Sequence, residues 1–425
     1  MKTLIKNGTL VNPRGLSGQY DVLVEDGVIA QIATSIEAEA DEVLNAAGCW
    51  VMPGFIDMHC HLREPGQEYK EDIETGTLAA AYGGFTGVAC MPNTRPVNDD
   101  KTVTRYILER AREVGSAHVY PIASITKGLK GEELSEMGIL LEQGAVAFSD
   151  DGRPVQDANR MRLALQYAKN FGALLISHCE ELSLVGEGVM NEGYWSAVCG
   201  LKGISRTAEE VMIARELILA EAYDARIHIA HISTEGGVEL LRQAKARGVR
   251  ATGETCPHYF SATDEWCASY DTNTKMNPPL RTEKDVEAVK RGLADGTIDV
   301  LATDHAPHHI DEKNVEFNLA LNGIVGFETA FSLAMTNLVE PGALTPAQLV
   351  ERLSAKPAEI LGVPGGALAE GEPADITIAD PEAEVTYSAE MLHSRSKNSP
   401  FLGKPYHGKV LYTIMGGRIT ARRER

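Results

Sequence analysis

The feature that most restricts the fold is a regular alternation of apolar runs with amphipathic stretches between residues 53 and 365. The apolar runs have the length of buried strands, and the stretches between them have helical periodicity. About eight such βα units predict a (β/α)8 barrel, an α/β fold. A doubly wound open sheet is the alternative, but no glycine-rich dinucleotide loop follows the first run. The apolar runs are Phe55–His61, Phe85–Met91, His118–Ile125, Gly144–Phe148, Ala173–Ser177, Ile227–His231, Val249–Glu254 and Val300–Ala302, and the clearest helical stretches are Ala158–Phe171, Thr207–Tyr223, Gly236–Arg247 and Thr282–Ala294.

Both ends of the chain have the pattern of short strands with tight turns. Leu4–Val11 predicts strand, Asn-Gly turn and strand, and Asp21–Ile29 repeats this with Asp-Gly. Near the other end Ala374–Asp380 alternates, and Val410–Ile419 is interrupted by two glycines. We therefore expect one small β-sandwich built from both termini, the alternative being two unrelated β appendages. The expected division is 1–52 for the first part of the sandwich, 53–365 for the barrel and 366–425 for the second part.

Charge and cysteine content exclude several classes of protein. The 425 residues include 60 acidic and 40 basic ones, a net charge of −20 that disfavours nucleic acid and anionic membranes as partners. The seven cysteines are an odd number without a CxxC pair, which favours reduced thiols in the cytoplasm. We expect no signal peptide, because the N-terminus is polar, and no membrane span, because no apolar run reaches about 18 residues.

Histidine and aspartate residues follow the apolar runs directly. His59 and His61 lie two residues apart, so on a strand they share one face. Nitrogen and carboxylate ligands without cysteine suit zinc or manganese at a hydrolytic site. His228 lies an odd number of residues from His231, which assigns it to the core or the barrel exterior. Side chains alternate along a strand, so Cys60 and Cys179 are expected to point away from the neighbouring ligands. The structural alternative is a set of hydrogen-bonded histidines at a barrel mouth. The residues at the strand ends are His59, His61, Asn93, Asp150, Asp151, His178, His231 and Asp304.

A set of longer motifs resembles the cyclic amidohydrolases, and most closely the type I dihydroorotases. The resemblance runs nearly from end to end, and the first and last motifs are the most specific. The motifs are Asp57–Gly66 (DMHCHLREPG), Met91–Thr94 (MPNT), Phe148–Pro154 (FSDDGRP), His178–Glu180 (HCE), His231–Thr234 (HIST), Thr255–Tyr259 (TCPHY), Asn277–Arg281 (NPPLR) and Thr303–His308 (TDHAPH).

The resemblance implies an activity and a set of metal ligands. The reaction would be the reversible, zinc-dependent cyclisation of N-carbamoyl-L-aspartate to L-dihydroorotate and water in pyrimidine (UMP) biosynthesis. One or two Zn²⁺ ions per subunit would be bound, with Asp151 between them if there are two. Asp304 would also be the catalytic proton shuttle. The implied metal ligands are His59, His61, Asp151, His178, His231 and Asp304.

The resemblance also implies substrate contacts. Arg63, Asn93 and His308 would together bind the substrate carboxylate. Each has a structural alternative. Arg63 could form an ion pair with Glu64 or Glu68, His308 could be an ordinary loop histidine, and Asn93 could cap the following loop. Relatives are expected to have an aromatic residue where Asn322 stands, and Asp311–Leu321 is expected to be a mobile polar loop near the pocket. The full predicted set of substrate-binding residues is His61, Arg63, Asn93, Asn277, His308, Asn322 and Gly323.

Two other functions compete with this one. Hydantoinases and allantoinases bridge their metals with a carboxylated lysine, but here no lysine lies between Lys130 and Lys169, the latter in a predicted helix. A non-catalytic barrel subunit would have lost ligands, whereas this chain keeps all six. The resemblance further implies a small-molecule substrate, a homodimer and an association with aspartate carbamoyltransferase.

Overall fold

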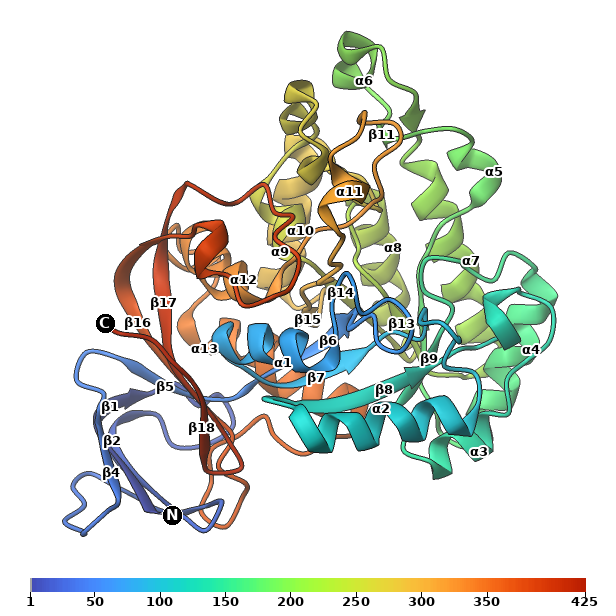
Figure 1. Cartoon of the computed structure of the whole chain (residues 1–425). Helices are drawn as coiled ribbons and strands as arrows, with labels where there is room; N and C mark the ends of the chain where they lie inside the picture. Colours follow the sequence, from blue (N-terminus) through green and yellow to red (C-terminus); the bar gives the residue numbers. More distant parts are fainter. Residues whose placement is uncertain (1) are drawn as a thin grey trace.

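The computed structural model describes residues 2–425 and contains the expected barrel of eight parallel strands. Hydrogen bonds connect the strands in the order β15-β14-β13-β10-β9-β8-β7-β6 (Figure 1). The backbone N–H of His61 donates to the carbonyl of His305 over 2.8 Å and brings the two edges together. The strands are β6 (Phe55–Cys60), β7 (Phe85–Cys90), β8 (His118–Ala123), β9 (Ala147–Ser149), β10 (Leu175–Ser177), β13 (Ile227–Ile229), β14 (Ala251–Thr255) and β15 (Val300–Leu301). All eight predicted strands are confirmed.

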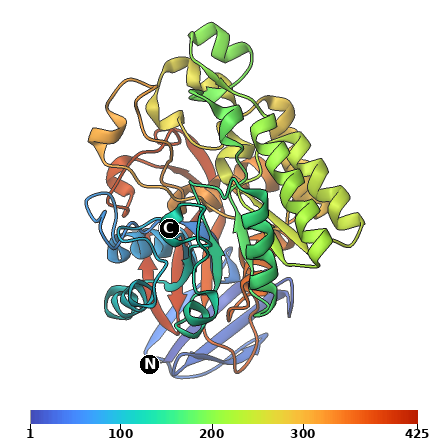
Figure 2. The same cartoon turned by 90° about the vertical axis from the view of Figure 1, so that its right-hand side faces the viewer.

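Helices cover the outside of the barrel (Figure 2). Aspartates accept hydrogen bonds from the first turns of α1, α2 and α4, as expected of N-caps. The four predicted helical stretches are confirmed within about two residues as α4, α7, α8 and α10. The helices are α1 (Ile73–Tyr82), α2 (Lys101–Val114), α3 (Met137–Glu142), α4 (Ala158–Lys169), α5 (Leu182–Val185), α6 (Tyr194–Cys199), α7 (Thr207–Tyr223), α8 (Glu235–Ala246), α9 (Pro257–Ser261), α10 (Glu283–Asp295), α11 (Ile310–Lys313), α12 (Phe327–Ala334), α13 (Pro346–Val350) and α14 (Lys356–Leu361).

A second sheet combines the two ends of the chain, so the alternative of two unrelated appendages is wrong. Its strands run in the order β18-β17-β16-β5-β1-β2-β3, and β4 pairs with β1. In Figure 1 the N-terminal and C-terminal strands lie side by side, at one side of the barrel. Ile5, Val22 and Ile376 belong to its own apolar core. The strands are β1 (Lys2–Leu10), β2 (Gly18–Glu25), β3 (Val28–Ala33), β4 (Glu42–Asn45), β5 (Trp50–Pro53), β16 (Ile376–Thr386), β17 (Pro405–Met415) and β18 (Arg418–Arg422), while β11 (Met190–Asn191) and β12 (Gly203–Ile204) form a separate pair.

One turn prediction is wrong. Asn7-Gly8 does not end a strand, because β1 continues through it and pairs with β2 on both sides of a bulge. The other edge of β1 pairs with β4 before Asn7 and with β5 after Gly8, so tertiary pairing overrides the local turn preference. Asp26-Gly27 does form the expected hairpin turn, with φ of 50° and 86°.

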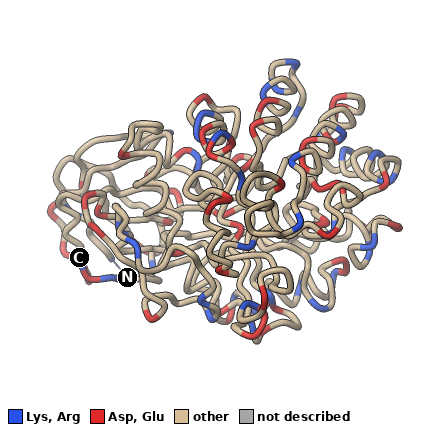
Figure 3. Tube along the Cα trace, turned by 90° about the horizontal axis from the view of Figure 1, so that it is seen from above, with Lys and Arg blue, Asp and Glu red and all other residues tan. Residues whose placement is uncertain are grey.

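Charged side chains of both signs are interspersed along the chain (Figure 3). Many of them pair across neighbouring helices, for example Arg247 with Glu221 at 3.0 Å. No helix within residues 2–425 is both long enough and apolar enough to cross a membrane.

Candidate metal centre

Four imidazole groups at the carboxyl ends of three barrel strands, β6, β10 and β13, converge on the carboxylate of Asp151, which lies two residues after β9. Asp151 Oδ1 lies 3.4 Å from His59 Nε2, 3.6 Å from His178 Nδ1 and 3.7 Å from His231 Nε2. The second oxygen, Oδ2, lies 3.6 Å from His61 Nε2. These side chains form two groups of potential metal ligands that share Asp151, one with His59 and His61 and one with His178 and His231. The arrangement can therefore hold two ions bridged by one carboxylate.

The orientation of His59 fits a metal ligand. Its Nδ1 lies 2.7 Å from Glu254 Oε1 on β14, which leaves Nε2 facing Asp151. His59 is fully buried, and its Nε2 has no hydrogen-bond partner. A buried imidazole nitrogen without a partner is costly unless something binds it. A carboxylate behind the ring and a free nitrogen in front are typical of a metal-ligating histidine.

The second group is packed more tightly. His178 Nδ1 lies 2.8 Å from His231 Nε2, and both face Asp151. The other nitrogen of His178 contacts Glu180 Oε2 at 3.3 Å. Burial would raise the pKa of Asp151, but His59, His178 and His231 hold that pKa well below its usual value. Asp151 therefore lies among imidazoles that favour its ionised form, which suits a carboxylate shared by two ions.

Asp304 completes the centre from the loop after β15. Its Oδ1 lies 3.3 Å from His61 Nε2 and 3.6 Å from His59 Nε2. Asp304 has a φ of 47°, and the neighbouring Thr303 is fixed by backbone and hydroxyl hydrogen bonds to the buried Asp57. Burial would raise the pKa of Asp304, but His59 and His61 lower it below its usual value. Left-handed backbone at a non-glycine residue is unfavourable, and it persists here because the surroundings enforce it.

A polar pocket of about 220 Å³ opens above these ligands. Every predicted site residue except His59 lines it, together with Gly152 and Ala306. Arg63 Nε donates to the carbonyl of Pro307 over 3.2 Å, and Arg63 Nη2 lies 3.4 Å from His308 Nε2. No carboxylate within residues 2–425 pairs with this buried guanidinium, so it remains free to bind an anion.

The alternative role for Arg63, an ion pair with Glu64 or Glu68, is wrong. Glu64 instead pairs with Arg110 at 3.3 Å and accepts a hydrogen bond from Tyr106. Glu68 accepts from the backbone N–H of Gly66. Burial lowers the pKa of Arg63, while Asp304 and Glu312 oppose that effect. A buried cation facing a polar pocket is a natural partner for a carboxylate.

The amide side chains of the pocket are partly engaged by ligand residues. Asn93 Oδ1 lies 2.9 Å from His61 Nδ1, so Asn93 orients a candidate ligand and does not merely cap a loop. Asn277 Nδ2 donates to Glu180 Oε1 over 2.9 Å. Glu180 thereby connects Asn277 with His178. Because these amides hold ligand residues in place, the ligand set and the pocket form one hydrogen-bonded unit.

His308 is more constrained than the sequence indicates. Its Nε2 lies 2.7 Å from the carbonyl of Asn322, and its Nδ1 lies 3.2 Å from Glu312 Oε2 and 3.5 Å from Lys70 Nζ. Burial together with Arg63, Lys70 and Lys313 lowers the pKa of His308 strongly. The contact between its imidazole and the Asn322 carbonyl holds the segment that carries Asn322.

The assignment of His228 to the core or the barrel exterior is confirmed as the core: its side chain is fully buried, with Nε2 3.2 Å from Glu254 Oε2. The strand β13 ends at Ile229, and His231 has a φ of 34°, so the regular strand alternation does not continue to His231. Glu254 thus connects His59 with His228. Sequence reasoning missed Glu254, although its place at the end of a strand was a usable signal.

The cysteine predictions are confirmed, with one addition. Cys60 Sγ contacts the carbonyl of Ala89 and Cys179 Sγ that of Ser177, away from the ligands. Cys256, by contrast, follows β14 and forms a third group of potential ligands with His258 and Asp304. Its position two residues after the inward-facing Glu254 could have identified it by the same alternation.

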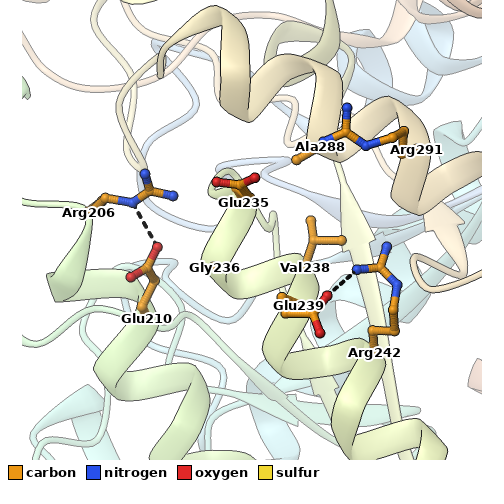
Figure 4. Close-up of a pocket in the computed structure, with 9 residues that line it drawn as sticks. All are labelled: Arg206, Glu210, Glu235, Gly236, Val238, Glu239, Arg242, Ala288 and Arg291. Carbon is orange, nitrogen blue, oxygen red and sulfur yellow. Dashed lines mark hydrogen bonds and ion pairs between the residues drawn. The ribbon is translucent and has the colours of Figure 1, made fainter.

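A larger pocket of about 480 Å³ lies among α7, α8 and α10, outside the barrel (Figure 4). Its acidic side chains are ion-paired: Glu210 with Arg206 at 2.8 Å, and Glu239 with Arg242 at 2.6 Å. None of the predicted metal ligands lines it. This pocket is therefore separate from the candidate metal centre.

Comparison with known proteins agrees with this geometry. The sequence profile of the family described as "Dihydro-orotase-like" matches residues 48–236. A dihydroorotase from Acetivibrio thermocellus is 57% identical over 99% of both chains, and one from Ruminiclostridium cellulolyticum is 55% identical over 100% of this chain and 99% of its own. Among solved structures, an L-hydantoinase from Arthrobacter aurescens has a TM-score of 0.90 and 26% identity, covering 100% of this chain and 96% of its own.

Proposed function

The chain belongs to the dihydroorotase family of cyclic amide hydrolases, and we propose that it interconverts N-carbamoyl-L-aspartate and L-dihydroorotate at the polar pocket above Asp151. The observation that carries the proposal is the buried guanidinium of Arg63, which faces this pocket without a carboxylate partner. Dihydroorotate brings the carboxylate that such a cation needs.

The metal would be held by the two groups of ligands that share Asp151. His59, His61 and Asp304 would bind one ion, and His178 and His231 the other, with Asp151 bridging both. Zinc suits a set of imidazoles and carboxylates. When bound, a divalent metal lowers the pKa of a coordinated water and polarises a carbonyl oxygen.

The protein's own groups then orient the substrate and move the proton. Arg63 holds the substrate carboxylate, which fixes the ring with its amide carbonyl toward Asp151. Asp304 takes the proton of the attacking water on its carboxylate and gives it to the amide nitrogen that leaves. In the cyclisation direction Asp304 takes a proton from that nitrogen as the ring closes and returns it to the departing carboxyl oxygen, which leaves as water. Glu254, Asn93 and the other side chains behind the ligands keep the imidazoles aligned.

A hydantoinase-type activity is the second candidate, because solved hydantoinases share the fold. Two features disfavour it. The lining of the pocket contains no lysine that could be carboxylated, and Lys169 instead contacts Asp224 at 3.1 Å on the outside of the barrel. A neutral cyclic ureide would also leave the buried Arg63 without a partner.

A paired assay tests the proposal. Purified protein is analysed for bound metals, and the hydrolysis of dihydroorotate is followed by ultraviolet absorbance alongside that of hydantoin. We expect one or two zinc equivalents and turnover of dihydroorotate far above that of hydantoin. Hydantoin turnover equal to or faster than that of dihydroorotate would favour the second candidate.

The remaining properties rest on the family resemblance. We propose the division 1–52, 53–365 and 366–425, a homodimer, an association with aspartate carbamoyltransferase and a cytoplasmic location. All seven cysteines are free, which supports a reducing compartment. Light scattering after gel filtration, alone and with added aspartate carbamoyltransferase, tests the two assemblies: a monomeric mass or no shift on mixing would contradict them.

A further inference from the structure

Two buried lysines lie beside the pocket without carboxylate partners. Lys275 is 5% exposed and Lys313 is 3% exposed. No acidic side chain within residues 2–425 forms an ion pair with either of them. A buried ammonium without an anion is unfavourable unless its N–H groups are satisfied in another way. The partners that these two lysines use are therefore informative.

Both ammonium groups donate to backbone carbonyls of one segment, residues 314–323. Lys313 Nζ lies 2.8 Å from the carbonyl of Leu321 and 3.1 Å from that of Gly323. Lys275 Nζ lies 2.8 Å from the carbonyl of Ala320 and 3.0 Å from that of Asn318. The predicted loop thus begins with the short helix α11 and then wraps around two cations.

The same lysines connect this segment to a second one. Lys313 Nζ lies 3.4 Å from the carbonyl of Lys275, and that carbonyl also accepts the N–H of Gly323 over 3.0 Å. Residues 275–277 and 320–323 are therefore held against each other. Both segments end in the pocket, where Asn277, Asn322 and Gly323 form part of the lining.

The backbone conformation at Gly323 leaves no room for a side chain. Its φ is 129°, and a Cβ there would lie 2.7 Å from Ala306 Cβ. Asn398 Nδ2 donates to the Gly323 carbonyl over 3.0 Å, beside Lys313 Nζ at 3.1 Å. The two donors fix this carbonyl from two sides.

We propose that Lys275 and Lys313 are positioning residues, a lysine clamp that holds residues 275–277 and 320–323 in the conformation that binds the substrate ring. This inference rests on the function proposed above. The six proposed metal ligands lie on other elements: His59 and His61 at β6, Asp151 after β9, His178 after β10, His231 after β13 and Asp304 after β15. The clamp should therefore govern substrate affinity and leave the metal centre intact.

The test compares Lys313→Met and Lys275→Met with a matched control. Lys245 on α8 also donates hydrogen bonds to two backbone carbonyls, those of Gly296 and Thr297, and to the carboxylate of Asp299. These partners precede β15 and lie away from the barrel mouth. Lys245→Met should lower the melting temperature without changing KM. Each clamp variant should raise the KM for dihydroorotate by about 10-fold, change kcat by less than about 3-fold and keep its metal content. Hydrogen exchange should become faster in residues 314–323, and saturating dihydroorotate should reverse this.

The inference would be overturned if the Lys313→Met variant is folded and metal-loaded but shows an unchanged KM for dihydroorotate and unchanged hydrogen exchange in residues 314–323. If that variant does not fold, Lys275→Met decides by the same two measurements. A fall in kcat and metal content at constant KM would also overturn it, because the lysines would then act on the metal centre. Failure of the wild-type protein to hydrolyse dihydroorotate would instead refute the proposed function, while hydrogen exchange would still test the clamp.

Discussion

Replacing Arg63 by methionine tests the proposed substrate orientation most directly. Methionine keeps much of the buried apolar volume and removes the guanidinium. In the structure Arg63 Nε already donates to the carbonyl of Pro307, which leaves the Nη groups for a ligand. The backbone at Arg63 has a φ of 61°, which methionine must also adopt. We expect a small loss of stability and a large loss of substrate affinity.

The magnitude follows from the type of bond that is lost. Hydrogen bonds between charged groups contribute about 1.5–3 kcal/mol, and a buried carboxylate without a partner is costly. This range corresponds to a loss of about 10- to 150-fold in kcat/KM, mainly through KM. The loss could exceed this range if the pocket stays dry in the variant, because desolvation of the substrate carboxylate is then uncompensated.

The assay should separate the carboxylate contact from general damage. Dihydrouracil is the same ring without the carboxylate, and its binding can be measured as competitive inhibition. Arg63→Met should weaken the binding of dihydroorotate strongly and the binding of dihydrouracil by less than about 3-fold. The difference between the two changes gives the coupling energy between Arg63 and the substrate carboxylate. Equal weakening of both ligands, or unchanged dihydroorotate kinetics in a metal-loaded variant, would refute the reasoning and return Arg63 to a structural role.

Four further predictions concern the metal centre and its chemistry. Asp304→Asn should keep the fold and lose about 10²- to 10⁴-fold in turnover, and near-normal turnover would remove Asp304 from proton transfer. Asp151→Ala should lose one metal equivalent and most activity. Asp150→Asn should keep its metal and its activity, since Asp150 accepts hydrogen bonds from the backbone of Ile125 and Thr126 instead. The apoprotein should also recover its activity with zinc in bicarbonate-free buffer, and a need for bicarbonate would indicate a carboxylated lysine. Glu254→Gln should weaken metal binding by about 10- to 100-fold in a chelator competition, and unchanged affinity would contradict its role behind His59. Cyclisation should be favoured at acid pH, because it consumes the protonated side-chain carboxyl of N-carbamoyl-L-aspartate, and hydrolysis at alkaline pH; parallel pH profiles would be inconsistent with this.

Much of the fold could be predicted because its signals are local and repeated. Each barrel strand is a short apolar run, buried on both faces, and the helices between them have clear periodicity and aspartate caps. The strand-end histidines and aspartates follow from the same pattern, since parallel strands place their carboxyl ends at one rim. The turn prediction failed where long-range pairing outweighed a local preference. Pairing on both edges kept β1 continuous through Asn7-Gly8.

The sequence by itself determined which groups are present and on which strand ends they lie, because alternation and apolar runs are properties of neighbouring residues. It therefore determined the barrel and the principal candidate ligands. Only the tertiary structure decided which groups support them. Glu254 contacts His59 across 195 positions, and Glu180 contacts Asn277 across 97. Lys313 satisfies carbonyls that no periodicity connects to it. Such partners are selected by burial, because a buried polar group must find a donor or acceptor wherever the fold brings one.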